Sequence, residues 1–327
     1  MDNQLALIYG DLNISWFAIF VFAGCLIGTL LACFLRKISG KNASDVFILV
    51  TFAVPIAVIF ARIQYCVFAD ENFSNVFDML NLSNGGYGLY GAILGVFAAA
   101  VIVNLLFKMG GVGSLLDCAA LGGVFAITVG RFATHFTGTE IGYEVSFNVL
   151  SVPDANGNVN NLAVYMLDGI LEAVIFAVCL AFFMIQFKNK NEKALCGTTA
   201  LIALALHGTN QVVMDSLRSD ALKLGANDFI KISQIIGIIT CVAVLVYFMV
   251  RVIKRDSLKK YNILHIIIIL LCIVFGILSE YRVGNGNYIS KHIMMLACMV
   301  VLAALTVWYG MRTVHTVSEP KASVVNQ

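Results

Sequence analysis

Nine apolar segments, each long enough to cross a lipid bilayer, constrain this sequence more than any other feature. A transmembrane helix needs about 20 mostly apolar residues, because the hydrocarbon core of a bilayer is about 30 Å thick and a helix rises about 1.5 Å per residue. The segments lie at 14–35, 46–68, 88–107, 113–133, 162–187, 195–214, 230–250, 263–280 and 293–311. We therefore predict an all-α polytopic membrane protein with about nine transmembrane helices.

The composition supports this prediction. Of the 327 residues, 60% are hydrophobic and only 12% are charged, whereas a soluble domain carries about 25% charged residues. All nine cysteines lie in or beside apolar segments and none forms a CxxC pair, so we interpret them as packing residues and not as zinc ligands. Asp2 and Asp11 stand where a signal peptide carries positive charge, so we expect no cleavable signal peptide.

Basic residues alternate between the loops and predict the orientation of the helices. They are concentrated after the first, third, fifth and seventh segments, at Arg36, Lys37, Lys41, Lys108, Lys188, Lys190, Lys193, Arg251, Lys254, Arg255, Lys259 and Lys260. The alternate loops are poorer in basic residues. Because cytoplasmic loops carry the excess of lysine and arginine, we place the N-terminus outside and the C-terminus in the cytoplasm.

Two connections divide the chain. The loop at 143–161 is the longest outside connection, and the stretch DANGN at 154–158 predicts a turn at its tip. The basic linker after the seventh segment separates the last two segments from the others. We therefore expect a seven-helix membrane domain at 1–255, followed at 256–327 by an additional transmembrane hairpin and a cytoplasmic tail.

Polar side chains at helical spacing mark the fifth and sixth segments. The first stripe is Tyr165, Asp168 and Glu172, and the second is His207, Gln211, Asp215 and Arg218. Ionisable groups within membrane spans usually face the interior of the bundle, so we expect the two stripes to face inward, toward each other or toward Arg131. A structural hydrogen-bond network explains such stripes as well as a functional site does.

Arg131 ends the fourth segment at the predicted outer face, in the stretch GRFATHFTGTEIG. A guanidinium suits a phosphate because it can donate two parallel hydrogen bonds. Arg62 and Arg218 also lie near outer ends, and we expect the glycines that open the run at 84–95 to leave backbone amides accessible to an anion. Together these features predict a site for an anionic phospholipid headgroup. The simpler alternatives are snorkelling of Arg62, and pairing of Arg218 with Asp215.

Seven pieces of the chain, in order, resemble motifs of the bacterial prolipoprotein diacylglyceryl transferases. They are ISWFAIFVFAGCLIG, ARIQYCVF, GGYGLYGAILG, LLDCAAL, GRFATHFTGTEIG, YMLDGILEAV and DSLRSD…SQIIG. The fifth resembles the family signature Gly-Arg-x-Gly-Asn-Phe-x-Asn-x-Glu-x-x-Gly. The resemblance covers about residues 14–250, which is the whole predicted seven-helix body.

The resemblance implies a concrete reaction. The diacylglyceryl group of phosphatidylglycerol would pass to the lipobox cysteine thiol of a preprolipoprotein, which gives a thioether and glycerol-1-phosphate. The thiolate would be the nucleophile, and cationic donors on the leaving phosphate would lower the barrier. The resemblance implies the bacterial cytoplasmic membrane as the location, and it implies no metal, soluble cofactor or nucleic acid.

The motifs also imply site residues by position. The implied catalytic residues are Tyr90, Arg131, Glu140 and Arg218, and the implied substrate-binding residues are Arg62, Tyr65, Gly85, Gly86, Gly91, Thr134, His135, Gly142 and Gln234. In this interpretation the two arginines Arg131 and Arg218 hold the leaving phosphate. Tyr90 assists proton transfer or orients the substrate.

The chain departs from the family pattern inside the signature. Thr134 stands in place of an asparagine, Glu140 comes one position after the family's glutamate, and Gln211 replaces an arginine. Either Glu140 and His135 supply, through a shift in the loop, what the family's signature residues normally supply, or the site has been altered. The first alternative is a divergent transferase, and the second is an inactive or repurposed homologue that binds phosphatidylglycerol or a lipoprotein precursor. A third alternative is a small transporter that uses the carboxylates of the two stripes.

Overall fold

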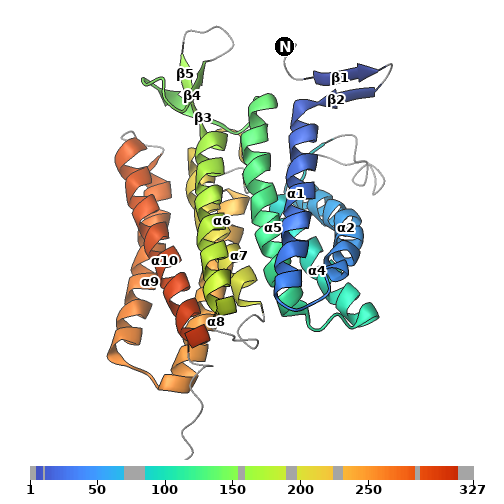
Figure 1. Cartoon of the computed structure of the whole chain (residues 1–327). Helices are drawn as coiled ribbons and strands as arrows, with labels where there is room; N and C mark the ends of the chain where they lie inside the picture. Colours follow the sequence, from blue (N-terminus) through green and yellow to red (C-terminus); the bar gives the residue numbers. More distant parts are fainter. Residues whose placement is uncertain are drawn as a thin grey trace, which may run out of the picture.

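The computed structural model describes residues 5–9, 12–69, 85–153, 159–188, 197–223, 231–283 and 288–315. The long helices of this part form one bundle (Figure 1). They are α1 (Trp16–Ile38), α2 (Ser44–Phe68), α4 (Leu89–Phe107), α5 (Val112–Ala133), α6 (Val164–Lys188), α7 (Thr198–Leu217), α8 (Ile232–Asp256), α9 (Lys260–Val283) and α10 (Tyr288–His315). Each predicted segment coincides with one of these helices. Eight helices of the described part are long and apolar enough to cross a membrane, which confirms an all-α, multi-pass membrane fold.

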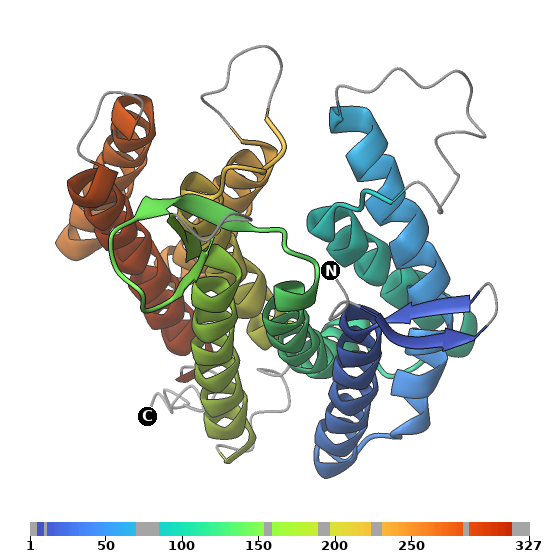
Figure 2. The ribbon, with the colours of Figure 1, turned by 90° about the horizontal axis from the view of Figure 1, so that it is seen from above.

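The helices pack in a sequence of pairs. Helix α1 packs against α5 and α2 against α4, while α6 lies between α5 and α7, and α7 packs against α8. Seen from above, α1, α2 and α4 lie on one side, α9 and α10 on the other, and α5 to α8 between them (Figure 2). Helix α1 begins and α10 ends at opposite ends of the bundle (Figure 1).

Glycines allow two of these pairs to approach very closely. A Cβ added at Gly28 of α1 would lie 2.3 Å from the carbonyl oxygen of Gly122 in α5. A Cβ at Gly91 would lie 2.4 Å from the carbonyl oxygen of Phe60, and one at Gly95 would lie 2.6 Å from Ala57, so α4 touches the backbone of α2. The small-residue spacing of the glycine run therefore serves helix packing, as expected from its sequence.

Helix α7 is the polar centre of the bundle. Sixteen of its 20 residues are buried, and its neighbours are α5, α6, α8 and α10. Its first turn is capped from another helix, because the Asp117 carboxylate of α5 accepts hydrogen bonds from the amides of Gly197 and Ala200, both at 2.8 Å. Asp117 is thus a helix cap, although it caps α7 and not its own helix.

A small sheet follows the C-terminal end of α5. The strands β3 (Ile141–Val145), β4 (Ser151–Pro153) and β5 (Asn160–Ala163) form an antiparallel sheet in the order β3-β5-β4. The connection predicted as a loop is therefore partly strand, and its predicted DANGN turn lies outside the described residues. A second antiparallel pair, β1 (Leu5–Tyr9) and β2 (Leu12–Ser15), leads into α1 at the same end of the bundle (Figure 1).

The C-terminal hairpin of α9 and α10 packs on the rest of the bundle. Helix α10 contacts both α7 and α8. Near the C-terminal ends of α7 and α9, the Ser216 hydroxyl donates a hydrogen bond of 2.6 Å to Glu280 of α9. The hairpin therefore covers the side of α7 that would otherwise face lipid.

Candidate functional site

Arg131 and Arg218 meet through Glu140 at the end of the bundle where α5 and α7 end. Arg131 lies in the last turn of α5, and Arg218 directly follows α7. The Glu140 carboxylate accepts a hydrogen bond from Arg131, and it lies 3.1 Å from Nη1 of Arg218. Glu140 has a left-handed backbone with a φ of 59°, and its amide donates to Asp220 at 2.9 Å. The loop thus holds one carboxylate between two guanidinium groups.

Arg131 is oriented by two further side chains. Its Nε lies 2.8 Å from the Asp168 carboxylate, and its Nη2 donates to Gln211 at 3.1 Å. Nη1 and Nη2 each donate one hydrogen bond, to Glu140 and to Gln211, whereas Nε makes only an ion-pair contact with Asp168. Within the described residues, one N–H on Nη1 and one on Nη2 have no partner, so Arg131 is fixed and still has donors to offer.

Arg218 is held in a similar way. Its Nε lies 3.0 Å from Asp220, and its Nη1 lies 3.4 Å from Asp215. No contact to its Nη2 is present in the described part of the chain. Burial disfavours the charged form of Asp220, but the charge of Arg218 and its hydrogen bond outweigh this effect, so the pKa of Asp220 lies below its usual value.

A buried polar network continues from Arg131 into the bundle. Asp168 accepts a hydrogen bond of 2.6 Å from the Asn210 amide, which also donates to Glu172 at 2.8 Å. The same Glu172 oxygen lies 2.6 Å from Nδ1 of His207. The expectation that the two stripes face each other and Arg131 is therefore confirmed. Asn210 was missed, although its position three residues after His207 places it on the same face of α7.

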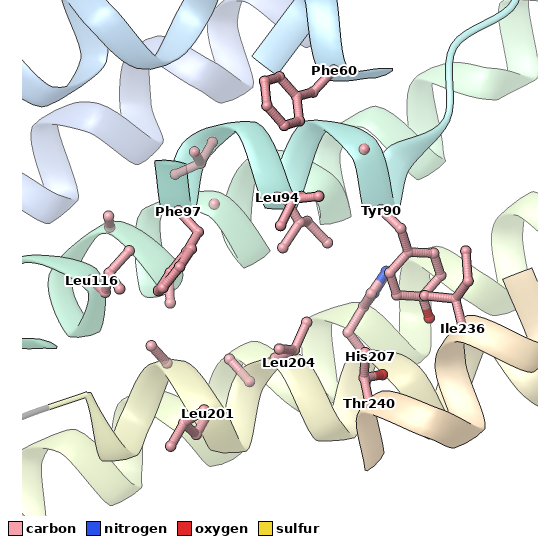
Figure 3. Close-up of a pocket in the computed structure, with 18 of the residues that line it drawn as sticks. Phe60, Tyr90, Leu94, Phe97, Leu116, Leu201, Leu204, His207, Ile236 and Thr240 are labelled. Atoms are coloured by element: carbon pink, nitrogen blue, oxygen red, sulfur yellow. The ribbon is translucent and has the colours of Figure 1, made fainter. Parts of the chain in front are cut away.

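An apolar groove of about 960 Å³ lies between α2, α4, α5, α7 and α8. Its lining is almost entirely aliphatic and aromatic, and Tyr90, His207 and Thr240 supply polar groups. Figure 3 shows these three side chains gathered at one end, with Phe97 and Leu201 toward the other. A groove of this size and lining suits the apolar part of a lipid.

Tyr90 and His207 meet at the polar end of the groove. Their ring centroids are 5.6 Å apart, and both side chains are buried, with 8% and 2% of their surface exposed. The Tyr90 hydroxyl and Nε2 of His207 have no hydrogen-bond partner among the described residues. Two buried polar atoms thus lie unpaired at this end of the largely apolar groove.

Arg62 belongs to a separate cluster with the glycine run. Its Nη1 donates to the carbonyl oxygens of Gly85 and, at 3.2 Å, Gly86, and its guanidinium lies 5.5 Å from the centre of the Tyr65 ring. A Cβ on Gly86 would overlap this ring at 2.4 Å. Arg62 thus bonds the carbonyls of the glycine run, whereas Glu140 bridges Arg131 and Arg218.

The amides of the glycine run are used in packing α4 on α2. The amide of Gly91 donates to the side chain of Gln64, and that of Gly88 donates to the carbonyl of Ala61 at 2.9 Å. The expectation that Gly88 leaves its amide accessible to an anion is therefore wrong. The close approach of the two helices satisfies these donors within the protein.

Thr134 and His135 of the signature make their side-chain hydrogen bonds away from the two guanidinium groups. The Thr134 hydroxyl donates back to Gly130 in its own helix at 3.1 Å, and Nδ1 of His135 lies 2.8 Å from the Tyr165 hydroxyl. Among the described signature side chains, Glu140 is the one in contact with both guanidinium groups, whereas His135 lies apart.

Gly142 and Gln234 position backbone near Arg218. Gly142 pairs with Arg218 in an isolated β-bridge, and a Cβ on Gly142 would lie 2.7 Å from the carbonyl oxygen of Leu217. The Gln234 side chain donates to the carbonyl of Val212 at 3.1 Å and accepts from the amide of Lys231 at 3.2 Å. Gln234 thus caps α8, and its amide is used within the protein.

Comparison with known proteins gives one consistent result. The family described as "Prolipoprotein diacylglyceryl transferase" matches residues 4–250. A phosphatidylglycerol–prolipoprotein diacylglyceryl transferase of Clostridium botulinum (strain Langeland) is 26% identical over 265 residues, which is 79% of this chain and 100% of the relative. A protein of the same name from Clostridium kluyveri (strain ATCC 8527) is 25% identical over 254 residues, or 75% of this chain and 96% of the relative. The family match ends before α9 begins.

Proposed function

The chain belongs to the prolipoprotein diacylglyceryl transferase family, and we propose that it transfers the diacylglyceryl group of phosphatidylglycerol to the lipobox cysteine of preprolipoproteins. The observation that carries this proposal is the pair of arginines bridged by Glu140 at the outer end of a bundle that also contains an apolar groove. A phospholipid has the same two parts, a phosphate and acyl chains. The pairing of the two sites therefore supports a lipid substrate.

The arginines act on the leaving group. The substrate thiolate attacks the glyceryl carbon, the bond from that carbon to the phosphate oxygen breaks, and glycerol-1-phosphate leaves with the electron pair. Negative charge grows on the phosphate during this step, so donors already aimed at it lower the barrier. The unengaged N–H groups of Arg131 and Arg218 are the donors that we assign to this role.

The carboxylates around the arginines keep them in place before the lipid arrives. Asp168, Glu140, Asp215 and Asp220 lie within 4 Å of the two guanidinium groups and outnumber them. A guanidinium that is oriented beforehand needs little reorganisation in the transition state. The excess of negative charge also weakens the attraction for phosphate, so the site favours orientation over tight lipid binding.

We further propose the orientation and location that this chemistry requires. The arginine pair faces outward from the bacterial cytoplasmic membrane, with the N-terminus outside and the C-terminus in the cytoplasm. This orientation agrees with the alternation of basic loops along the chain. An exported precursor and a phospholipid headgroup could then meet at the arginines.

The test is a transfer assay with purified protein. Phosphatidylglycerol and a lipobox peptide are supplied, and the thioether-linked peptide and glycerol-1-phosphate are measured together. A peptide with serine in place of the cysteine is the matched control and should give no product. A well-folded sample that forms neither product contradicts the proposal.

One observation favours a second candidate, a homologue that binds without transferring. Thr134 stands in the signature but its hydroxyl is bonded to its own helix, so it adds nothing to the arginine pair. In the same assay, binding of phosphatidylglycerol or of the peptide without any thioether product would support this candidate.

A further inference from the structure

We propose that His207, held by Glu172, is the general base that takes the proton from the substrate thiol. This inference rests on the proposed function and adds to it a residue that the comparison of motifs did not assign to the site. It follows from the geometry of the buried polar network and of the groove.

Glu172 orients the imidazole of His207. Nδ1 of His207 lies 2.6 Å from a Glu172 oxygen, and the same oxygen accepts a hydrogen bond from Asn210. A carboxylate beside Nδ1 fixes the neutral tautomer that carries its proton there, which leaves a lone pair on Nε2. The carboxylate also stabilises the imidazolium that forms once Nε2 accepts a proton.

Nε2 of His207 lacks a hydrogen-bond partner among the described residues. His207 is 2% exposed and Glu172 is fully buried. Burying a ring nitrogen without a partner is destabilising, so a purely structural role leaves this atom unexplained. His207 lines the groove, so its imidazole forms part of the wall at the polar end.

Close packing fixes the position of His207 and its neighbour Tyr90 in the groove. Tyr90, in the first turn of α4, packs beside His207, and a Cβ added at Gly237 of α8 would lie 3.0 Å from the Tyr90 hydroxyl. A Cβ at Gly208, next to His207, would lie 2.6 Å from the carbonyl oxygen of Gly237. The backbones of α7 and α8 therefore touch at this point and fix the imidazole at the polar end of the groove.

The reaction moves one proton and exchanges a C–O bond for an S–C bond. The S–H proton moves to Nε2, and the resulting thiolate forms the S–C bond to the glyceryl carbon while the C–O bond to phosphate breaks. The phosphate leaves with the electron pair of that bond. The proton on Nε2 passes to the leaving phosphate or to water, which restores the neutral imidazole.

The experiment measures the transfer rates of the wild type and of a His207→Gln variant with two lipobox peptides. One peptide carries cysteine, and the other carries selenocysteine, whose selenol is already ionised at neutral pH. General base catalysis contributes about 10²–10⁴-fold, so we expect the variant to lose about that factor in kcat with the cysteine peptide. With the selenocysteine peptide we expect it to stay within about tenfold of the wild type, because no base is needed.

A matched control is His265→Gln, since His265 lies in α9 and bonds Tyr309 at 3.0 Å outside the groove. It should leave the ratio of the two peptide rates unchanged. An equal loss of His207→Gln with both peptides, or full activity with cysteine, would overturn the general base while the transfer reaction stands. A folded wild-type protein that modifies neither peptide would overturn the proposed function and the base with it.

Discussion

The replacement Arg131→Lys tests the central role given to the arginine pair. Lysine keeps the positive charge but loses the planar fork of donors. The guanidinium contacts Glu140, lies 2.8 Å from Asp168 with Nε, and donates to Gln211 at 3.1 Å with Nη2. One ammonium group cannot reach all three partners and still present donors to a phosphate.

The expected magnitudes follow from these contacts. Loss of one transition-state donor costs about 10²–10³-fold in kcat, and we expect a loss of this size in the transfer assay. The stability cost is smaller, because Asp168 keeps its hydrogen bonds from Asn210 at 2.6 Å and from Gln211. We expect the free energy of unfolding to fall by about 1–3 kcal/mol.

Arg36→Lys is the matched control. Arg36 is likewise ion-paired, with Nη2 at 2.7 Å from Asp45, and it is fully buried, but it contacts Ser114 and Met109 at the other end of the bundle. It should lose stability and keep the kcat of the folded fraction. An Arg131→Lys protein whose kcat stays within about threefold of the wild type would refute the reasoning that the fork stabilises the leaving phosphate.

Three further changes test the packing and the charges of the fold. Gly122→Ala should lower the free energy of unfolding by at least about 1–3 kcal/mol, because its Cβ would lie 2.3 Å from the backbone of α1. The adjacent Gly123→Ala should be neutral or stabilising by up to about 1 kcal/mol, because nothing lies within 4 Å of its Cβ; equal thermal shifts for the pair would contradict the packing. Asp220→Asn should cost at most about 1 kcal/mol, since Asp220 is partly exposed. Because the folded pKa of Asp220 is depressed by Arg218, this contribution is present above the unfolded pKa of about 3.9 and is lost as the pH falls through the folded pKa. A stability difference from wild type that persists unchanged to the lowest pH would contradict the ion pair. Truncation after residue 255 should lower the melting temperature, because α10 covers α7 and α8; an unchanged value would show that the hairpin is an independent unit.

The sequence predicts the helices of this protein well, because apolar length alone determines which segments can cross a bilayer. It also predicts the stripes on α6 and α7, since burial of Asp168 and Glu172 follows from the cost of charge in lipid. The small outer sheet was missed because strands of three to five residues leave a weak pattern in a loop.

The partners of the polar side chains could not be read from the sequence. Arg62 and Arg131 have similar sequence surroundings, each at the outer end of an apolar segment. Only the packing of α4 on α2 shows that Arg62 bonds glycine carbonyls while Arg131 meets two carboxylates. His207 was recognised as buried, but its contact with Glu172 joins residues 35 positions apart on different helices.

The polarity of α7 has a consequence for how the protein enters the membrane. Helix α7 carries His207, Asn210 and Gln211 in its middle, and it is absent from the eight described helices with the hydropathy of a span. Its polar groups find their partners on α6, which is synthesised earlier, through the contact of His207 with Glu172 and of Gln211 with Asp168. Helix α7 therefore partitions into lipid as the partner of a preceding helix, and the order of helix assembly is set by the same contacts that make up the site.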